Sequence, residues 1–321
     1  STSEMIGNAI ILLTEVIKKY EPDIFIVYAD RFESFAATIA SSQTNTVTAH
    51  VEGGDLTEGG ALDDNVRHAM TKLSHLHYVT NKDSYSRIKA MGEEEWRIQL
   101  AGYPAIDLID NNEFVNQEDI CNFIDIDINK PIIIFTQHSV TNKYKLAKEQ
   151  LLASINGIKK ISKERYIQCI FTYPNNDAGG IEIFETIKKY TNDINNSIIR
   201  ESLGRKLYWG LLSLSRDPNK TIICMGNSSS GIKETSTFHC PTINIGTRQD
   251  GRLRSTNIID CGYDAEEIYI AIKKCLDDDA FKAICQKSIN PYGLGGAGQK
   301  IANHLADIEL TDRLLTKKMT I

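Results

Sequence analysis

The chain has 321 residues, of which 41% are hydrophobic, 8% aromatic and 24% charged, with a formal net charge of −6 at pH 7. At roughly 150 residues per domain this length indicates two domains with real cores, and the composition excludes intrinsic disorder, a collagen-like repeat and a small disulfide scaffold. The acidic balance (pI about 5.7) argues against an extended surface for nucleic acid or anionic membrane, but it allows a local basic pocket for a small anion.

The first third of the chain alternates between helical and strand-like patterns. Ser1 and Glu4 have the spacing of a capping box, and apolar residues then recur at helical spacing as far as Tyr20. The run from Ile24 to Tyr28 is continuously β-prone, as expected of a buried parallel strand. The alternation predicts parallel strands joined by helical crossovers. The next expected elements are helix 32–40, strand 46–50, helix 64–73, strand 76–80, helix 83–91 and strand 97–101.

A polar, irregular stretch from residue 111 to 129 precedes a second series, and we interpret it as an inter-domain linker. A Gly-rich bend after Tyr292 and Gly293 precedes a last amphipathic helix from residue 299 to about 310. We therefore expect an α/β protein with two Rossmann-like, parallel-sheet domains: residues 1–115 completed by the C-terminal segment 299–321, and residues 116–298. The second series predicts strands 132–137, 167–173, 197–200, 221–225 and 242–245, and helices 143–158, 181–190 and 206–214.

The seven cysteines stand singly, with no C-x-x-C pair, and we interpret them as buried reduced thiols in a reducing compartment. No apolar run approaches the roughly 18 residues of a membrane span, and no signal peptide opens the chain. We expect a cytoplasmic protein with neither a nucleic acid nor a membrane as its partner.

Ligands of doubly wound α/β folds bind at the carboxyl ends of the strands, so polar residues just after each strand are the candidates. Crowded carboxylates raise each other's pKa values, which suits general acid–base catalysis. Two plainer interpretations are a solvated acidic loop and a metal site at His50 and Glu52, although their i, i+2 spacing lacks a matched ligand set. In the first domain the candidates are Asp30-Arg31, His50-Val51-Glu52-Gly53-Gly54-Asp55, Glu58, Asp63, Asp64 and Arg67.

In the second domain Gln137-His138 ends a predicted strand, and the turn from Tyr173 to Gly180 follows another. The most informative segment is Gly226-Asn227-Ser228-Ser229-Ser230-Gly231, where a strand leads through small residues into a helix. Its N–H groups, hydroxyls and helix dipole predict a diphosphate site, with Glu234 placed for ribose hydroxyls and Arg248 as a cation. Neither a Walker A loop nor a G-x-G-x-x-G turn occurs, and the plain alternative is a Ser-rich turn without a ligand.

With these segments in order, the chain closely resembles the hydrolysing UDP-N-acetylglucosamine 2-epimerases. That family comprises bacterial sialic-acid pathway enzymes and the epimerase domain of the bifunctional animal UDP-GlcNAc 2-epimerase/ManNAc kinase. The resemblance runs from Ser1 to about Asn303. It rests on Ala29-Asp30-Arg31, His50-x-Glu52-Gly53-Gly54, Asp63-Asp64-x-x-Arg67-His68, Gln137-His138, Pro174-Asn175, Gly226-Asn227-Ser228-Ser229-Ser230-Gly231, Gly246-Thr247-Arg248-Gln249 and Asn290-Pro291-Tyr292-Gly293.

The resemblance implies a GT-B-like fold with the active site in the cleft between two Rossmann-like domains, the second of which binds UDP. It implies hydrolysis of UDP-GlcNAc to ManNAc and UDP with inversion at C2, through a 2-acetamidoglucal. No metal or organic cofactor is expected. The expected assembly is a homodimer or homotetramer. The residues carried over as catalytic are Asp30, Glu52, Asp63 and His138. Those carried over for substrate and UDP binding are Arg31, Arg67, His138, Asn175, Leu203, Asn227, Ser228, Ser229, Glu234 and Arg248.

The chain departs from the family in three places. The family's first strand and its Gly-Thr-Arg-x-Asp/Glu-Tyr loop have no match, so we expect the first domain to lack its first β-α units. Ala29 stands where Gly is usual, and Ser139 where Pro is usual.

Four alternatives stay open. They are a hydrolysing UDP-N,N′-diacetylbacillosamine 2-epimerase of legionaminic-acid biosynthesis, a non-hydrolysing epimerase, a GT-B glycosyltransferase and a non-catalytic UDP-sugar binder. The Asp63-Asp64 pair and the Ser-rich turn favour the hydrolysing branch. The intact Asp30, Glu52 and Asp63 argue against a pure binder, which has no use for carboxylates near a diphosphate.

Overall fold

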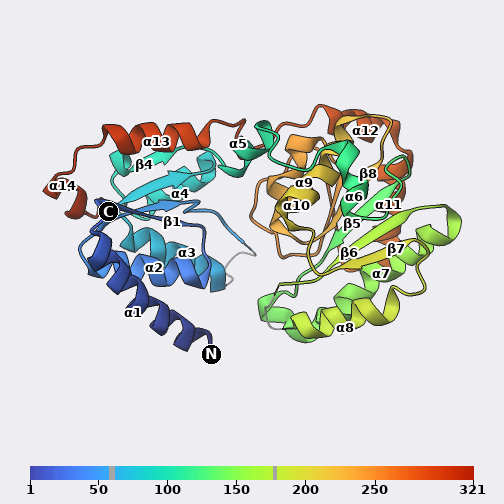
Figure 1. The fold of residues 1–321 in the computed structure, drawn as a ribbon, viewed down its shortest axis with the longest axis horizontal. Helices are drawn as coiled ribbons and strands as arrows, with labels where there is room; N and C mark the ends of the chain where they lie inside the picture. Colours follow the sequence, from blue (N-terminus) through green and yellow to red (C-terminus); the bar gives the residue numbers. More distant parts are fainter. Residues whose placement is uncertain (58–61, 176–178) are drawn as a thin grey trace. The chain divides into compact units, whose positions relative to one another are not determined.

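The protein was analysed as a computed structural model that describes residues 1–57, 62–175 and 179–321. These residues divide into two compact units, each built from parallel strands and helices (Figure 1). Unit 1 comprises Ser1–Asp107 and Tyr292–Ile321, and unit 2 comprises Leu108–Pro291.

Unit 1 contains a four-stranded parallel sheet in the order β1-β2-β3-β4. Every residue of β2 and β3 is buried, as expected of central parallel strands. The strands are β1 (Ile24–Tyr28), β2 (Val47–Val51), β3 (Leu76–Val79) and β4 (Ile98–Leu100). The helices are α1 (Thr2–Tyr20), α2 (Phe32–Gln43), α3 (Leu62–Leu73), α4 (Lys82–Ala90), α5 (Ala105–Asp110, at the boundary with unit 2), α13 (Ala297–Asp307) and α14 (Asp312–Leu315).

Both faces of the unit 1 sheet are covered. Helices α2 and α3 pack on one face, where Val27, Ala37 and Met70 form a buried cluster, and α13 lies over the other face (Figure 1). There Ile301 packs with Tyr78 and neighbouring residues of β2 and β3. The predicted capping box at the start of α1 is present, with Ser1 and Glu4 bonding reciprocally. The sheet therefore has a packed hydrophobic cluster on each face.

Unit 2 contains a six-stranded parallel sheet in the order β10-β9-β8-β5-β6-β7. Two crossover series run outward from the pair β5 and β8, so their carboxyl ends form the switch point at which doubly wound folds bind ligands. The strands are β5 (Ile132–Thr136), β6 (Gln168–Thr172), β7 (Ser197–Arg200), β8 (Ile222–Gly226), β9 (Thr242–Ile245) and β10 (Ile258–Cys261). The helices are α6 (Ile120–Phe123), α7 (Ala147–Glu164), α8 (Gly180–Tyr190), α9 (Gly204–Ser213), α10 (Ser229–Lys233), α11 (Ala265–Asp277) and α12 (Asp279–Gln286).

The stretch expected to be a linker is part of unit 2. It contains a 3-10 helix (Gln117–Asp119) and α6, and the side chains of Ile120 and Ile124 are buried. The Val115 N–H also donates to the Lys206 carbonyl over 3.1 Å. The polar composition of this stretch gave no indication of these buried side chains and this hydrogen bond. The expectation of an irregular linker was wrong.

The two units divide earlier in the chain than the expected boundaries after residues 115 and 298. Two sets of hydrogen bonds account for the difference. Tyr103 N–H donates to the Tyr292 carbonyl over 2.8 Å, and the first N–H groups of α13, from Ala297 and Gly298, donate to the Asp107 carboxylate over 3.0 and 2.6 Å. The bend after Tyr292 is thereby fixed to unit 1.

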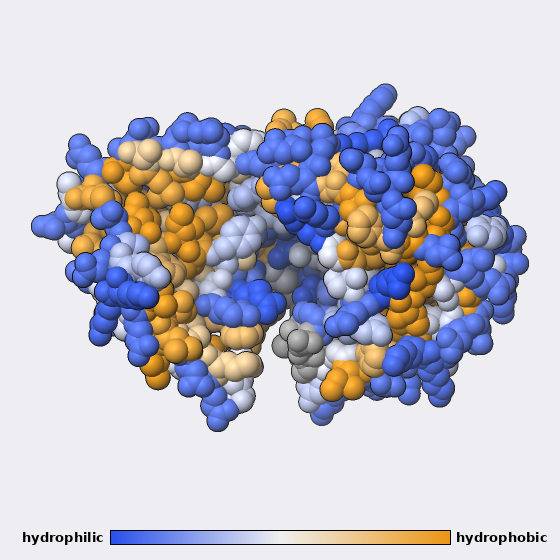
Figure 2. Space-filling model, in the orientation of Figure 1, coloured by the Kyte–Doolittle hydropathy of each residue, from blue (hydrophilic) through white to orange (hydrophobic). Residues whose placement is uncertain are grey.

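The surface of unit 1 carries apolar side chains that its own helices leave uncovered. Figure 2 shows hydrophobic residues over this unit, and the exposed ones include Ile11 and Leu12 of α1 and Ile26 of β1. β1 is an edge strand, and within the described residues no further strand pairs with its outer side.

The cysteines and the helices bear on two further expectations. All seven cysteines are free, but Cys121 is exposed whereas the other six are buried as expected. No helix in the described ranges has the length and apolar character needed to cross a membrane.

Candidate functional site

Two residues at strand ends of unit 1 have left-handed backbone. Ala29 after β1 has φ of 57° and Glu52 after β2 has φ of 67°, which costs a non-glycine residue about 1–2 kcal/mol. The turn at Ala29 is held by its N–H, which donates to Val51 O over 3.0 Å, and by its carbonyl, which accepts from His50 Nε2 over 2.7 Å. Such over-determined strain clusters at functional sites, and here it orients Asp30 and Glu52.

Arg67 of α3 neutralises the acidic bend. Its side chain is only 2% exposed and forms ion pairs with Asp30 and, over 2.7 Å, with Asp64. It also donates to the Asp55 carbonyl over 2.6 Å and to the Thr57 hydroxyl over 3.2 Å. Burial opposes its charge, but the three neighbouring carboxylates outweigh burial and raise the pKa of Arg67. The bend is therefore an ordered ion-pair network rather than a solvated acidic loop.

The other predicted residues of unit 1 lie around this network. Glu52 is buried and accepts a hydrogen bond from the Tyr28 hydroxyl. Asp63 lies in the first turn of α3 with an exposed side chain, next to Asp64. Arg31 is 69% exposed and pairs with Glu33 over 2.9 Å. Glu58 lies outside the described residues. We call Asp30, Glu52, Asp63, Asp64 and Arg67 the carboxylate cluster.

His50 donates a hydrogen bond to the backbone at the end of β1. It is buried, and burial lowers the pKa of His50 to about 4, with the Ala29 carbonyl opposing that shift. The neutral ring therefore donates through Nε2–H to Ala29. Among the described residues, no group of three or more His, Cys, Asp or Glu side chains is arranged to hold a metal ion.

In unit 2, Asn227 joins the loops that follow three neighbouring strands. Its Oδ1 accepts from the His138 N–H over 2.7 Å, and its Nδ2 donates to the His138 carbonyl over 2.9 Å. Its own carbonyl accepts from Arg248 over 3.2 Å and from Gln249 over 2.8 Å. These loops follow β5, β8 and β9. The side chain and backbone of Asn227 therefore connect the three loops at the switch point.

The tautomer of His138 is fixed by a neighbouring loop. The Asn175 N–H donates to His138 Nδ1 over 3.0 Å, so the proton of the neutral ring is on Nε2. Burial, and then the nearby Arg248 charge, lower the pKa of His138 to about 3. At neutral pH His138 is thus a neutral N–H donor.

The Ser-rich turn after β8 requires glycine at its start. Gly226 has φ of 129°, and a Cβ there would overlap the Thr136 carbonyl. Ser228 stands at the N-cap position of α10 without a side-chain capping bond, and α10 has only five residues. The helix dipole is therefore small, and anion binding would depend on N–H groups, hydroxyls and Arg248. We call His138, Asn227, Ser228, Ser229 and Arg248 the anion cluster.

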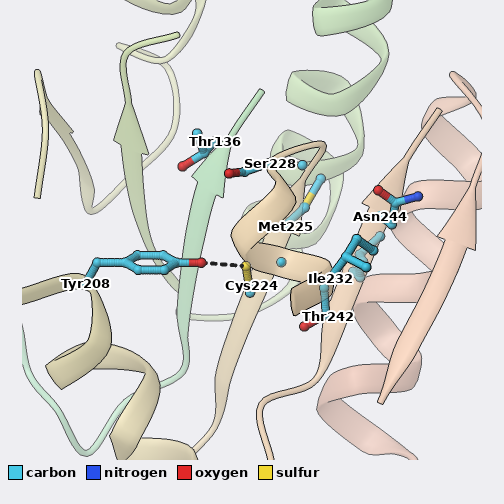
Figure 3. A pocket seen from close by; sticks show the side chains of 11 residues that line it. Thr136, Tyr208, Cys224, Met225, Ser228, Ile232, Thr242 and Asn244 are labelled. Carbon is cyan, nitrogen blue, oxygen red and sulfur yellow. Dashed lines mark hydrogen bonds between the residues drawn. The ribbon is translucent and has the colours of Figure 1, made fainter. Parts of the chain in front are cut away.

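A small cavity lies beneath this turn (Figure 3). Its volume is about 10 Å³, close to the size of one water molecule. The Tyr208 hydroxyl lies 3.4 Å from Cys224 Sγ and 3.1 Å from Ser230 Oγ. These contacts support the turn from below, so its hydroxyls are backed by packed side chains.

The remaining predicted residues of unit 2 lie on neighbouring elements. Glu234 follows α10 and accepts from the Trp209 indole N–H over 2.7 Å. Leu203 directly precedes α9, beyond the carboxyl end of β7. Of the Tyr173–Gly180 turn, residues 173–175, 179 and 180 are described, with Gly180 as the first residue of α8, and residues 176–178 lie outside the described ranges.

Sequence reasoning missed the partners that hold the predicted residues. Tyr28 and Trp209 supply the donors for Glu52 and Glu234, and Asn175 acts through its backbone. Tyr28 does have a signal, since it stands two residues before Asp30 at the end of an apolar strand. Trp209 has none, because its contact with Glu234 depends on how α9 packs beside α10.

Comparisons with known proteins identify the family. A family model described as UDP-N-acetylglucosamine 2-epimerase matches residues 1–306. The chain is 32% identical to the hydrolysing GDP/UDP-N,N′-diacetylbacillosamine 2-epimerase of Campylobacter jejuni, over 77% of this chain and 62% of that protein. It is 31% identical to the hydrolysing UDP-N,N′-diacetylbacillosamine 2-epimerase of Legionella pneumophila (99% and 79%) and 30% identical to the UDP-N-acetylglucosamine 2-epimerase of Neisseria meningitidis (87% and 70%).

Solved structures share the fold at lower identity. A UDP-GlcNAc 2-epimerase from Neisseria meningitidis bound to UDP-GlcNAc has a TM-score of 0.81 at 19% identity, covering 96% of this chain and 82% of that one. The Methanocaldococcus jannaschii enzyme in complex with UDP-GlcNAc and UDP has a TM-score of 0.75 at 18% identity (95% and 82%). The predicted α/β, GT-B-like fold of two parallel-sheet domains is confirmed. The chain therefore belongs to the UDP-N-acetylglucosamine 2-epimerase family.

Proposed function

We propose that the chain is a hydrolysing UDP-N-acetylglucosamine 2-epimerase, which converts UDP-GlcNAc and water to ManNAc and UDP for sialic-acid or nonulosonate biosynthesis. The observation that carries this proposal is the carboxylate cluster around buried Arg67, in a chain of this family. Removing and replacing a proton at C2 requires an acid and a base, and carboxylates in different environments are suited to the two roles. Here Asp30 pairs with Arg67, Glu52 accepts from Tyr28, and Asp63 is exposed.

The first half of the proposed reaction is an elimination. A carboxylate removes the C2 proton, and the electron pair of that C–H bond forms the C1–C2 double bond of 2-acetamidoglucal. The C1–O bond breaks at the same time, and its electron pair leaves with UDP. Asp30, Glu52 and Asp63 are proposed, as a set, to carry out the proton transfers.

The second half is an addition with the opposite stereochemistry at C2. An acid of the same set protonates C2 from the other face of the sugar, and water adds its oxygen to C1 and loses a proton. The products are ManNAc and free UDP. The water-derived oxygen at C1 distinguishes this route from a non-hydrolysing epimerase, which returns UDP to C1.

The anion cluster is proposed to hold the leaving UDP. A neutral His138 Nε2–H, two serine hydroxyls and the Arg248 guanidinium are donors that stabilise a departing diphosphate. Glu234 is proposed to accept from the ribose hydroxyls, with Asn175 and the Leu203 backbone near the nucleoside. Arg31 is proposed to exchange Glu33 for a phosphate, because an exposed ion pair is weak.

The test incubates the protein with UDP-GlcNAc in D₂O and follows the products by NMR. Free UDP with C2-deuterated ManNAc is the expected result. UDP-ManNAc without free UDP would move the protein to the non-hydrolysing branch. UDP binding without turnover would overturn the enzyme proposal in favour of a UDP-sugar binder.

A second candidate substrate is UDP-N,N′-diacetylbacillosamine. The relatives from Campylobacter jejuni and Legionella pneumophila, at 32% and 31% identity, are named for it. The chemistry at C1 and C2 would be unchanged, because the two substrates differ at C4 and C6. Running both substrates in the same D₂O experiment decides between them by the ratio of kcat/KM.

The proposed setting is the cytoplasm, and the proposed assembly is a homodimer or homotetramer. The assembly follows from the family resemblance, and the free thiols suit a reducing compartment. Light scattering after size-exclusion chromatography gives the particle mass. A mass equal to one chain across micromolar concentrations would contradict the oligomer.

A further inference from the structure

In unit 2 the carboxylate of Glu234 is held by the indole of Trp209. Glu234 directly follows α10 and is 9% exposed, and Trp209 of α9 is 2% exposed. The Nε1–H group of Trp209 donates to Glu234 Oε2 over 2.7 Å. A hydrogen bond in a buried site of low dielectric is stronger than the same bond in water. This contact therefore fixes the orientation of the carboxylate.

A carboxylate held by an indole can still bind a ligand. Two carboxylate oxygens offer about four acceptor positions, and the Trp209 N–H uses one of them. The indole is uncharged, so it orients Glu234 without bringing a cation of its own. Hydrogen bonds from hydroxyl groups to an ionised carboxylate are roughly twice as strong as those between neutral groups. Two adjacent hydroxyls, as on a ribose, therefore suit a carboxylate oriented in this way.

The packing of α9 keeps the indole in place. A Cβ on Gly210, the next residue, would stand 2.6 Å from the Val115 carbonyl oxygen, so α9 lies directly against that backbone. On the other side of Trp209, the hydroxyl of Tyr208 lies 3.1 Å from Ser230 Oγ and also contacts Cys224 Sγ (Figure 3). Helix α9 is thereby connected to the Ser-rich turn that belongs to the anion cluster. The position of the indole is fixed relative to that turn.

We propose that Trp209 is a positioning residue. Its N–H aligns Glu234 with the ribose hydroxyls of UDP, and this alignment makes the site select a ribonucleotide over a 2′-deoxyribonucleotide. The inference rests on the proposed function, in which Glu234 accepts from those hydroxyls. It adds the residue that orients the acceptor and the part of the ligand for which the site selects. Trp209 acts through Glu234 and not by contact with the nucleotide.

The test compares the binding of UDP and 2′-deoxy-UDP by isothermal titration calorimetry. The two probes share the base and the diphosphate and differ in one hydroxyl. Wild type should bind UDP at least about tenfold more tightly than 2′-deoxy-UDP. Trp209→Phe keeps an aromatic ring and removes the N–H. UDP binding should therefore weaken about tenfold in this variant, whereas 2′-deoxy-UDP binding should stay within about threefold of wild type.

Three further variants separate positioning from general damage to the structure. Trp96→Phe is the matched control, because Trp96 is the other tryptophan of the chain and lies in unit 1. Its two affinities should equal those of wild type. Trp209→His restores an N–H donor on a smaller ring and should recover part of the preference for UDP. In a Glu234→Gln background, Trp209→Phe should not change the ratio of the two affinities further, because Trp209 acts through that carboxylate.

Two results would overturn the proposal. One is an unchanged ratio of the two affinities in Trp209→Phe, which includes equal weakening of both nucleotides by a purely structural effect. The other is equal binding of UDP and 2′-deoxy-UDP by wild type. Failure of the proposed function has a different signature. Selective UDP binding without turnover of UDP-GlcNAc would contradict the epimerase and support the role of Trp209, whereas wild type that does not bind UDP would contradict both.

Discussion

At the scale of single residues, Asp63 gives the sharpest test of the carboxylate cluster. It lies exposed in the first turn of α3, so Asp63→Asn should leave the fold and the Arg67 ion pairs intact. We expect turnover to be abolished, with UDP affinity within a few-fold of wild type, because the amide cannot transfer the proton. Steady-state kinetics and UDP titration measure the two quantities.

Asp83→Asn is the matched control for that substitution. Asp83 is also exposed and lies in the first turn of a helix, α4. Asp83→Asn therefore removes the same charge from an equivalent position. Turnover by this variant should match wild type. Wild-type-like turnover by Asp63→Asn would remove Asp63 from the proposed set.

Gly54 lies where any side chain would collide with neighbouring residues. Its φ is 75°, and a Cβ would stand 2.6 Å from the Ser84 carbonyl and against Ile88. Gly54→Ala should therefore destabilise the protein by about 1–3 kcal/mol, measured as the free energy of unfolding in urea.

The same substitution at another position, Gly7→Ala, is expected to have the opposite effect on stability. Gly7 lies within α1 with nothing near its missing Cβ, so the change should stabilise by up to about 1 kcal/mol. Equal effects of the two substitutions would show that the backbone at Gly54 relaxes freely.

Residue types and spacing predicted which side chains stand at strand ends, but not how they are held. Asn227 is expected to bind UDP, and its amide also bonds the His138 backbone twice. A strand-end Asn has the same sequence pattern with or without this contact, so the spacing could not predict it. Arg31 is similar, since Glu33, two residues further along the chain, pairs with it.

At the scale of elements, the C-terminal segment fixes the end of α3. Lys317 Nζ donates to the carbonyls of Thr71, Lys72 and Ser74 over 2.8–3.1 Å and pairs with Glu93 over 2.7 Å. An ammonium at this position satisfies carbonyls that no residue of the helix itself can reach. The helix that carries Asp63 and Arg67 is thereby anchored from its far end.

Lys317→Met should destabilise the protein by about 2–4 kcal/mol in urea unfolding. The change leaves the fully buried Glu93 carboxylate with fewer partners and uncaps three carbonyls. Lys318→Met, at the next, exposed position, is the control and should stay within about 0.5 kcal/mol of wild type. Equal stability of the two variants would mean that the Lys317 contacts contribute nothing net.

Element types were predictable where the apolar pattern was strong. β1, β7 and β9 have the expected bounds, whereas β10, α11 and α12 received no prediction. Their N-cap residues Asp264 and Asp278 were available signals, since each accepts from the backbone of its helix. Helix α12 is short, and α11 follows a four-residue strand. Hydrophobic periodicity alone therefore gave little support for predicting them.

At the scale of the whole molecule, each unit contains a histidine that burial keeps neutral and whose ring is oriented by a backbone hydrogen bond. His50 is fixed by the Ala29 carbonyl in unit 1, and His138 by the Asn175 N–H in unit 2. His75 accepts from the Thr48 N–H in the same way. Burial of a neutral imidazole is inexpensive, but its protonation is not. Both units should therefore respond to mild acid.

The sign of that response follows from the pKa values. Burial lowers the pKa of His50 and His75 to about 4 and that of His138 to about 3, whereas an unfolded histidine titrates near 6.5. Between these values the unfolded chain binds more protons than the folded one, so stability is full above pH 6.5 and falls as pH decreases toward 4. Each histidine should contribute a loss of up to about 2 kcal/mol between pH 6.5 and pH 5.

The measurement compares urea unfolding near pH 7 and near pH 5 for wild type and His75→Gln. The buried carboxylate Glu93 does not titrate in this pH window. Burial raises its pKa, but its hydrogen-bond partners outweigh burial and lower the pKa to about 2. Its contribution to stability is therefore lost only in stronger acid. Glutamine can accept the Thr48 N–H but cannot be protonated, so the variant should lose about 2 kcal/mol less than wild type over this range. An identical loss in both proteins would mean that His75 is already charged, or equally solvated, in the folded state.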